Sequence, residues 1–189
     1  MKKILWLHSH FLFWMGGTKL VFQIMSHLSK NIEITCAVED YSDKAFESYK
    51  KQGIKLIKTI GTTSTSPLYW LSLEKNIQRN IEVLKPMIDD ETIVISSMFP
   101  MNVVGNALTK NHFQYLFEPF AFFHEDYLID NLPLTKRLFT RFLASRYKSL
   151  DIKATKEAKN LLTLNNHTSN AIEKIYGKPA VQTYTGIDT

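Results

Sequence analysis

The sequence has almost no cysteine. Its 189 residues include a single one, Cys36, which lies in an apolar run. An internal disulfide is therefore excluded, and no Cys-x-x-Cys pair exists that could begin a zinc site. We interpret Cys36 as a small buried hydrophobe, and the scarcity of cysteine as typical of a protein in the reducing cytoplasm.

Long hydrophobic runs are also missing. No stretch approaches the roughly 20 consecutive apolar residues that a membrane-spanning helix needs. The start, Met-Lys-Lys followed by apolar residues, imitates a signal peptide, but His8, Ser9 and His10 interrupt it and no small-residue cleavage site follows. Seven glycines and six prolines are too few for a low-complexity chain, and no internal repeat is visible. We expect a soluble domain, cytoplasmic and at most peripheral to a membrane.

Acidic residues are scarce in one segment. The chain has a net charge of +5, yet the stretch 136–159 contains eight basic and only two acidic side chains. Because the rest is close to neutral, the sequence argues against a general nucleic-acid-binding protein. Within a predicted helix over 132–158, Arg137, Arg141 and Lys148 fall on one stripe. Such a stripe suits either a solvated helix face or peripheral contact with an anionic membrane surface.

Short apolar runs alternate with amphipathic segments along the chain. The runs have the character of buried strands and cover 3–8, 32–38, 54–60, 92–97, 113–118, 160–165 and 179–184. Helical spacing predicts helices over 19–30, 43–52, 68–85, 101–110, 132–158 and 167–176. We expect Thr18 to cap the first helix, and Gly53 and Gly177 to end two later ones. This alternation predicts an α/β fold, a Rossmann-like parallel sheet with helices on both faces.

The first candidate site is the turn after the first strand. Ligands of parallel α/β sheets bind at the carboxyl ends of the strands. There, Gly16, Gly17 and Thr18 open a helix whose backbone N–H groups and dipole attract an anion such as phosphate, and glycine allows close approach. His10 lies in the same turn, together with several aromatic side chains. The alternative is a simple strand-to-helix turn with an aromatic lid.

The second candidate site is the stretch Phe-Glu-Pro-Phe-Ala-Phe-Phe-His-Glu-Asp-Tyr, residues 117–127, which follows a central strand. Its polar residues Glu118, His124, Glu125 and Asp126 could act as acid–base groups. Their spacing fits no standard zinc or calcium pattern, so no metal site is predicted. The alternative is a solvated loop.

The tail of the sequence has a distinctive order of elements: a strand at Leu161–Asn165, a helix at Thr168–Gly177 that ends in Tyr-Gly, a short strand at Ala180–Tyr184, and then Gly186-Ile187-Asp188. This order resembles the segment that closes the N-terminal domain of glycosyltransferase family 4 enzymes, in which the last motif is Gly-Val-Asp. The Gly16-Gly17-Thr18 turn is similar to the family's Gly-Gly loop. Residues Phe117-Glu118-Pro119 resemble its His-Glu-Pro stretch, with phenylalanine where histidine often stands.

The resemblance implies one half of a GT-B fold and a retaining transferase that needs no metal or other cofactor. Such an enzyme moves a sugar from a nucleotide-sugar donor to a glycan or lipid-linked acceptor. Residues 1–185 would form the acceptor-side domain, and 186–189 would begin the linker to an absent C-terminal, donor-binding domain. The catalytic residues would be Glu118 and His124, beside the transferred sugar. Contacts to the donor phosphates or the acceptor would come from Gly16, Gly17, Thr18 and His10.

Two other functions compete with this one. The chain could be a stand-alone nucleotide- or phosphate-binding enzyme such as an oxidoreductase or epimerase, with Glu39 or Asp40 holding a ribose. The Gly-x-Gly-x-x-Gly fingerprint of dinucleotide sites is missing, however. It could also be a non-catalytic interaction module that uses the basic helix. Under the first hypothesis, this domain alone is expected to be inactive, and polysaccharide or lipid glycan assembly is its expected setting.

Overall fold

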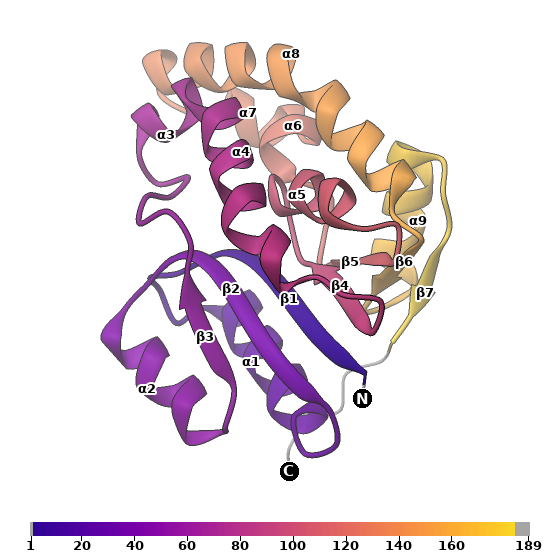
Figure 1. Cartoon of the computed structure of the whole chain (residues 1–189). Coiled ribbons are helices and arrows are strands. Elements are labelled where there is room, and N and C mark those ends of the chain that lie inside the picture. Colours follow the sequence, from indigo (N-terminus) through magenta and orange to yellow (C-terminus); the bar gives the residue numbers. More distant parts are fainter. Residues whose placement is uncertain (1, 184–189) are drawn as a thin grey trace.

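A sheet of seven parallel strands runs through residues 2–183, the part of the chain that the computed structural model describes (Figure 1). The strand order is β3-β2-β1-β4-β5-β6-β7. The strands are β1 (Lys3–Phe11), β2 (Glu33–Tyr41), β3 (Lys55–Lys58), β4 (Thr92–Ser96), β5 (His112–Leu116), β6 (Asn160–Thr163) and β7 (Ala180–Gln182). The predicted α/β class and Rossmann-like parallel sheet are confirmed.

Helices cover both faces of the sheet. They are α1 (Gly16–Leu28), α2 (Asp43–Lys51), α3 (Pro67–Leu71), α4 (Leu73–Leu84), α5 (Met101–Leu108), α6 (Ala121–His124), α7 (Asp126–Asp130), α8 (Leu134–Glu157) and α9 (Asn166–Tyr176), with a 3₁₀ turn at Lys85–Met87. The helices α1 and α2 lie on one face, and α4, α5, α8 and α9 on the other (Figure 1). Right-handed crossovers explain this division, because the chain builds from β1 to one edge, returns to the centre at β4, and builds to the other edge.

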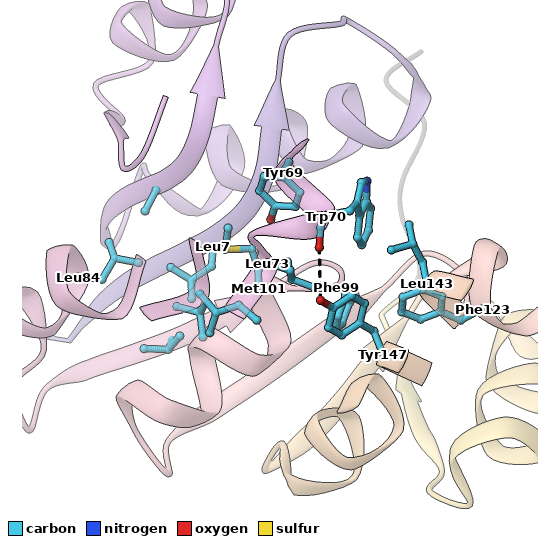
Figure 2. Packing of buried hydrophobic residues seen from close by; sticks show 14 of the residues in the cluster. Leu7, Tyr69, Trp70, Leu73, Leu84, Phe99, Met101, Phe123, Leu143 and Tyr147 are labelled. Atoms are coloured by element: carbon cyan, nitrogen blue, oxygen red, sulfur yellow. Dashed lines mark hydrogen bonds between the residues drawn. The ribbon is translucent and has the colours of Figure 1, made fainter. Parts of the chain in front are cut away.

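The interior strand β1 is buried on both faces. Leu5 and Leu7 face the α4–α5 side, where they join the cluster that Figure 2 shows around Trp70, Phe99 and Tyr147. Ile4 and Trp6 belong to a second cluster with α1 and α2. Burial of both faces is the reason that β1 appears in the sequence as a continuous apolar run rather than as an alternating one.

The strands β1 and β2 are longer than predicted. The predicted strands end at residues 8 and 38, but the two strands stay paired as far as Phe11 and Tyr41. Pairing satisfies the backbone N–H and C=O groups, and that gain outweighs the weak strand preference of the acidic residues. The extension buries Ser9 and Glu39, whereas His10 and Asp40 stay partly exposed.

Thr18 is not the N-cap of α1, contrary to the sequence prediction. The helix begins at Gly16 and its N-cap is Met15. Thr18 is the third helical residue; its Oγ1 accepts a hydrogen bond from the Met15 N–H at 2.8 Å, as in a capping box. Gly16 and Gly17 thus form the first turn of the helix.

Other boundaries differ in smaller ways. The helix predicted over 68–85 is two helices that meet at Ser72. Gly53 and Gly177 end helices as predicted, with φ angles of +70° and +64° that only glycine adopts without strain. The resemblance at Gly186-Ile187-Asp188, and with it the proposed domain boundary, lies outside the described residues.

Candidate functional site

The first turn of α1 is exposed at the carboxyl edge of the sheet. A Cβ added to Gly16 would meet nothing within 4 Å, and one added to Gly17 would meet only the Phe117 ring, at 4.0 Å. Packing therefore does not require glycine at either position. The first N–H groups of a helix have no partner within the helix, so this end can receive an anion that comes close to the backbone.

His10 lies near the end of β1, beside this turn. Its ring meets Phe13 edge-on, with centroids 6.1 Å apart, and its buried Nδ1 has no hydrogen-bond partner among the described residues. Burial lowers the pKa of His10, although the nearby Asp40 carboxylate acts in the opposite direction. His10 is thus a neutral, half-buried imidazole at the mouth of the sheet.

The second candidate site, residues 117–127, lies beside the first in space. Phe117 follows β5 directly, and its ring is the neighbour of Gly17. Glu118 comes next and is exposed. The structure therefore brings Gly17 and the Phe117–Pro119 stretch together, whereas Glu125 and Asp126 lie on the surface at the start of α7.

His124 is not at the surface of the site. Its side chain is only 2% exposed, and its Nε2 lies 3.0 Å from Oδ2 of Asp151, a residue of α8 that is equally buried. Tyr176 also donates to Oδ2, at 3.0 Å, and Asn102 donates to Oδ1, at 2.9 Å. The predicted catalytic histidine is thus part of a buried network that joins four helices.

A cavity of about 160 Å³ lies at the carboxyl ends of β4 and β5. Its polar lining comes from Ser97, Gln114, Glu118, Asp151 and Tyr176, and its aromatic lining from Phe99, Phe117, Phe120 and Phe122. Of the predicted site residues, Glu118 lines this cavity, and His124 touches it only through Asp151. Sequence reasoning missed Gln114, although an uncharged polar residue in the middle of an apolar strand was a usable signal.

A larger hollow of about 1000 Å³ lies on the other face of the sheet, between α1 and the strands β4 to β6. Trp6, Ile95, Tyr115 and Leu162 form its floor. None of the predicted site residues lines it. The predicted residues therefore gather at the carboxyl edge and not in this groove.

Two further observations concern metals and membranes. Within residues 2–183, no group of three or more His, Cys, Asp or Glu side chains is placed to hold a metal ion. In the same part of the chain, every helix is too short or too polar to cross a bilayer. The expectation that no metal is needed stays a prediction.

No protein-family model and no curated protein sequence matches this chain. Solved structures do. One is a UDP-glucosyltransferase from Polygonum tinctorium capable of glucosylating indoxyl, in complex with 3,4-dichloroaniline; it matches 95% of this chain with a TM-score of 0.56 and 11% identity. Another is UGT2 of Phytolacca americana, complexed with UDP-2fluoro-glucose and pterostilbene, which matches 99% with a TM-score of 0.60 and 7% identity.

These likenesses define the class of fold. The described chain has the architecture of one half of a GT-B glycosyltransferase. It spans about half the length of the proteins it matches, 51% of the first and 54% of the second. At such low identity the likeness concerns the fold alone.

Proposed function

We propose that this chain is the N-terminal, acceptor-side half of a cytoplasmic glycosyltransferase that moves a sugar from a nucleotide-sugar donor to a glycan or lipid-linked acceptor. One observation carries the proposal: in a half GT-B fold, the exposed Gly16-Gly17 helix start faces the Phe117 loop at the carboxyl edge of the sheet. The two solved structures add support, since the first is a UDP-glucosyltransferase and the second holds UDP-2fluoro-glucose.

The donor phosphates would meet the start of α1. Gly16 and Gly17 expose their backbone there, and the positive end of the helix dipole adds attraction. The Thr18 hydroxyl is committed to Met15 and to the Phe13 carbonyl, which accepts from it at 3.0 Å. Thr18 would therefore contribute its backbone and hold the turn in shape, while His10 would contact the donor or the acceptor from the end of β1.

The two predicted catalytic residues would have different roles. Glu118 is exposed at the mouth of the 160 Å³ cavity and can contact a sugar directly. His124 would act through Asp151, whose carboxylate it holds at 3.0 Å, and is a positioning residue in this proposal. Retention of the anomeric configuration and membership of family 4 are supported by the motif resemblance, as is the absence of a metal requirement.

The deciding experiment is a transfer assay on the full-length product of the gene with UDP- and GDP-sugars. We expect transfer by the full-length protein and none by residues 1–189 alone, because the proposed donor site is completed by a second domain. Calorimetry on residues 1–189 should show donor binding weaker than micromolar. A reading frame that ends at Thr189 would contradict the proposal, and micromolar nucleotide binding by this chain would favour a stand-alone nucleotide-binding enzyme instead.

A second candidate function is docking on an anionic membrane surface. Leu134, Leu138 and Phe142 follow one face of α8 and are 61%, 60% and 52% exposed. Tyr127 and Leu128 of the neighbouring α7 are also exposed. Apolar side chains beside a basic stripe are the composition of helices that lie in a lipid interface.

The basic stripe remains available for lipid phosphate. Arg141 pairs with Asp130 at 2.6 Å, but both side chains are more than half exposed, and such pairs are weak in water. Lys148 is exposed, whereas Arg137 is half-buried and donates to the Asp130 carbonyl. Membrane docking would bring a lipid-linked acceptor to the domain.

A further inference from the structure

Gln114 carries a buried amide that makes no hydrogen bond within residues 2–183. It lies in β5, between β4 and β6 in the sheet, and is fully buried. Neither Oε1 nor Nε2 of its side chain has a hydrogen-bond partner among the described residues. A leucine or methionine would fill this position without that cost, and buried polar groups are nearly always paired. The amide is therefore placed to bind something that residues 2–183 do not supply.

The space beside Gln114 is the 160 Å³ cavity, which Gln114 lines. This volume corresponds to about five water molecules. It can take one side of a pyranose ring with the hydroxyl groups on that side, while the rest of the sugar lies at the mouth beside the exposed Glu118, and it is too small for a nucleotide. The cavity also adjoins the proposed phosphate site, because its wall residue Phe117 is the neighbour of Gly17.

A second polar group of the cavity can accept a further hydrogen bond. Asp151 Oδ1 accepts from Asn102 at 2.9 Å and, as a carboxylate oxygen, has room for another donor. Asn102, His124 and Tyr176 hold this side chain without a ligand, so the site is formed in advance. Ser97 also lines the cavity, but its Oγ accepts from the Trp6 indole N–H at 2.6 Å, on the opposite face of the sheet from Gln114.

The charge of the cavity disfavours an anion. The carboxylate of Asp151 lies in its wall and that of Glu118 at its mouth. A phosphate or carboxylate ligand would meet repulsion there. A neutral ligand whose hydroxyl groups both donate and accept matches the amide of Gln114 and the two acids.

Aromatic rings form the rest of the wall and are held by the core. Phe99 stacks on Trp70 at 6.4 Å, and Phe120 meets Phe123 edge-on at 4.7 Å (the rings of Trp70, Phe99 and Phe123 are drawn in Figure 2). Apolar walls with a few fixed polar groups are typical of small-molecule sites. The C–H faces of a sugar ring suit such a wall.

We propose that this cavity binds one neutral sugar ring, and that adjacent hydroxyl groups of the ring exchange hydrogen bonds with the Gln114 amide. The inference rests on the proposed function only in taking this ring to be the end of the acceptor. It assigns to Gln114 and Asp151 the recognition of that ring. The acceptor would accordingly be a glycan or glycolipid with a terminal sugar rather than an aromatic aglycone.

The test is a titration of the ¹⁵N-labelled chain with the methyl glycosides of glucose, galactose, mannose and N-acetylglucosamine. We expect at least one of them to shift the side-chain NH₂ signals of Gln114 at concentrations up to about 50 mM. Such concentrations lie well above the dissociation constant of a weakly bound small ligand. In Q114M the affinity should fall more than about tenfold, because the two hydrogen bonds are lost. The matched variant Q78M, at an exposed position of α4, should bind as the unaltered chain does.

Either of two results would overturn the inference: no glycoside shifts the Gln114 signals, or the affinity survives in Q114M. Because the first readout uses the unaltered chain, poor folding of Q114M cannot hide the answer. Nor does the test depend on transfer. Sugar binding without transfer by the full-length protein would support the sugar site and contradict the proposed function. Transfer without sugar binding would support the proposed function and contradict the sugar site.

Discussion

The α-carbon of Gly17 faces the ring of Phe117, and a Cβ on Gly17 would lie 4.0 Å from that ring. The two residues are far apart in the sequence, at the start of α1 and just after β5. Their contact joins the proposed phosphate site to the cavity that Gln114 lines. A donor at the helix start and a sugar in the cavity would therefore be neighbours.

The double variant G16A/G17A should separate stability from function. Neither added methyl group would clash, and alanine favours a helix over glycine by up to about 1 kcal/mol per residue, so thermal melting should show an unchanged or higher Tm. Transfer by the full-length protein should fall about 10-fold or more, because the methyl groups keep phosphate from the N–H groups. Full activity at an unchanged Tm would show that the start of α1 is not part of the site.

Gly105 should not tolerate alanine. A Cβ there would lie 2.5 Å from Nε2 of the His112 ring, which is held by Ser96 at 2.8 Å and by Asn106 at 2.6 Å. We expect G105A to lower the free energy of unfolding by about 1–3 kcal/mol in urea titrations. G16A is the control, and equal stability of both variants would contradict the packing around His112.

Glu39 should make the protein less stable as the pH rises. Burial raises its pKa to about 8, even though Tyr69 and Asn80 donate hydrogen bonds to it. Between pH 4.5, the ordinary pKa of a glutamate, and pH 8, Glu39 is ionised in the unfolded chain but keeps its proton in the folded chain. The folded state therefore loses stability as the pH rises across this window. E39Q should therefore raise the Tm at pH 8 and change it little at pH 4. The exposed control E47Q should show no such difference.

His8 should act in the opposite direction. Burial lowers its pKa to about 3, and its ring stacks on Phe11 at 4.8 Å. As the pH falls below 6.5, His8 becomes protonated in the unfolded chain but stays neutral in the folded chain until about pH 3. The folded state therefore loses stability across this range. In H8L the loss of Tm between pH 7 and pH 4 should be smaller than in the unaltered chain. An identical loss in both proteins would show that His8 does not contribute to it.

Membrane docking predicts a charge-dependent affinity for vesicles. The triple variant R137E/R141E/K148E should bind vesicles rich in phosphatidylserine more than about tenfold more weakly in a flotation assay, since each basic residue near the surface contributes about 1 kcal/mol. The control K44E/K50E/K51E changes the same charge on α2, on the other face of the sheet, and should bind normally. Equal loss in both variants would indicate a general charge effect and contradict a docking surface on α8.

Much of the fold could be predicted because its signals are local. All seven strands and the long helices were found from periodicity and from glycine stops, and Gly53 and Gly177 have the positive φ that those stops require. The errors fell where distant contacts overrode local preference, as when pairing with β1 carried β2 through Glu39 and Asp40. The candidate site was predicted only in part, because the burial of His124 depends on Asp151 from another helix.

The sequence by itself determined the alternation of strands and helices, the glycine start of α1 and the basic character of α8, since each follows from neighbouring residues. Only the tertiary structure decided which polar groups would meet. It placed Gly17 against Phe117, enclosed His124 with Asp151, and left Gln114 beside a cavity with no hydrogen-bond partner in the described part of the chain. The physical reason is that burial and hydrogen bonding in a parallel sheet depend on which distant segments the strand order brings together. No pattern of neighbouring residues predicts that order.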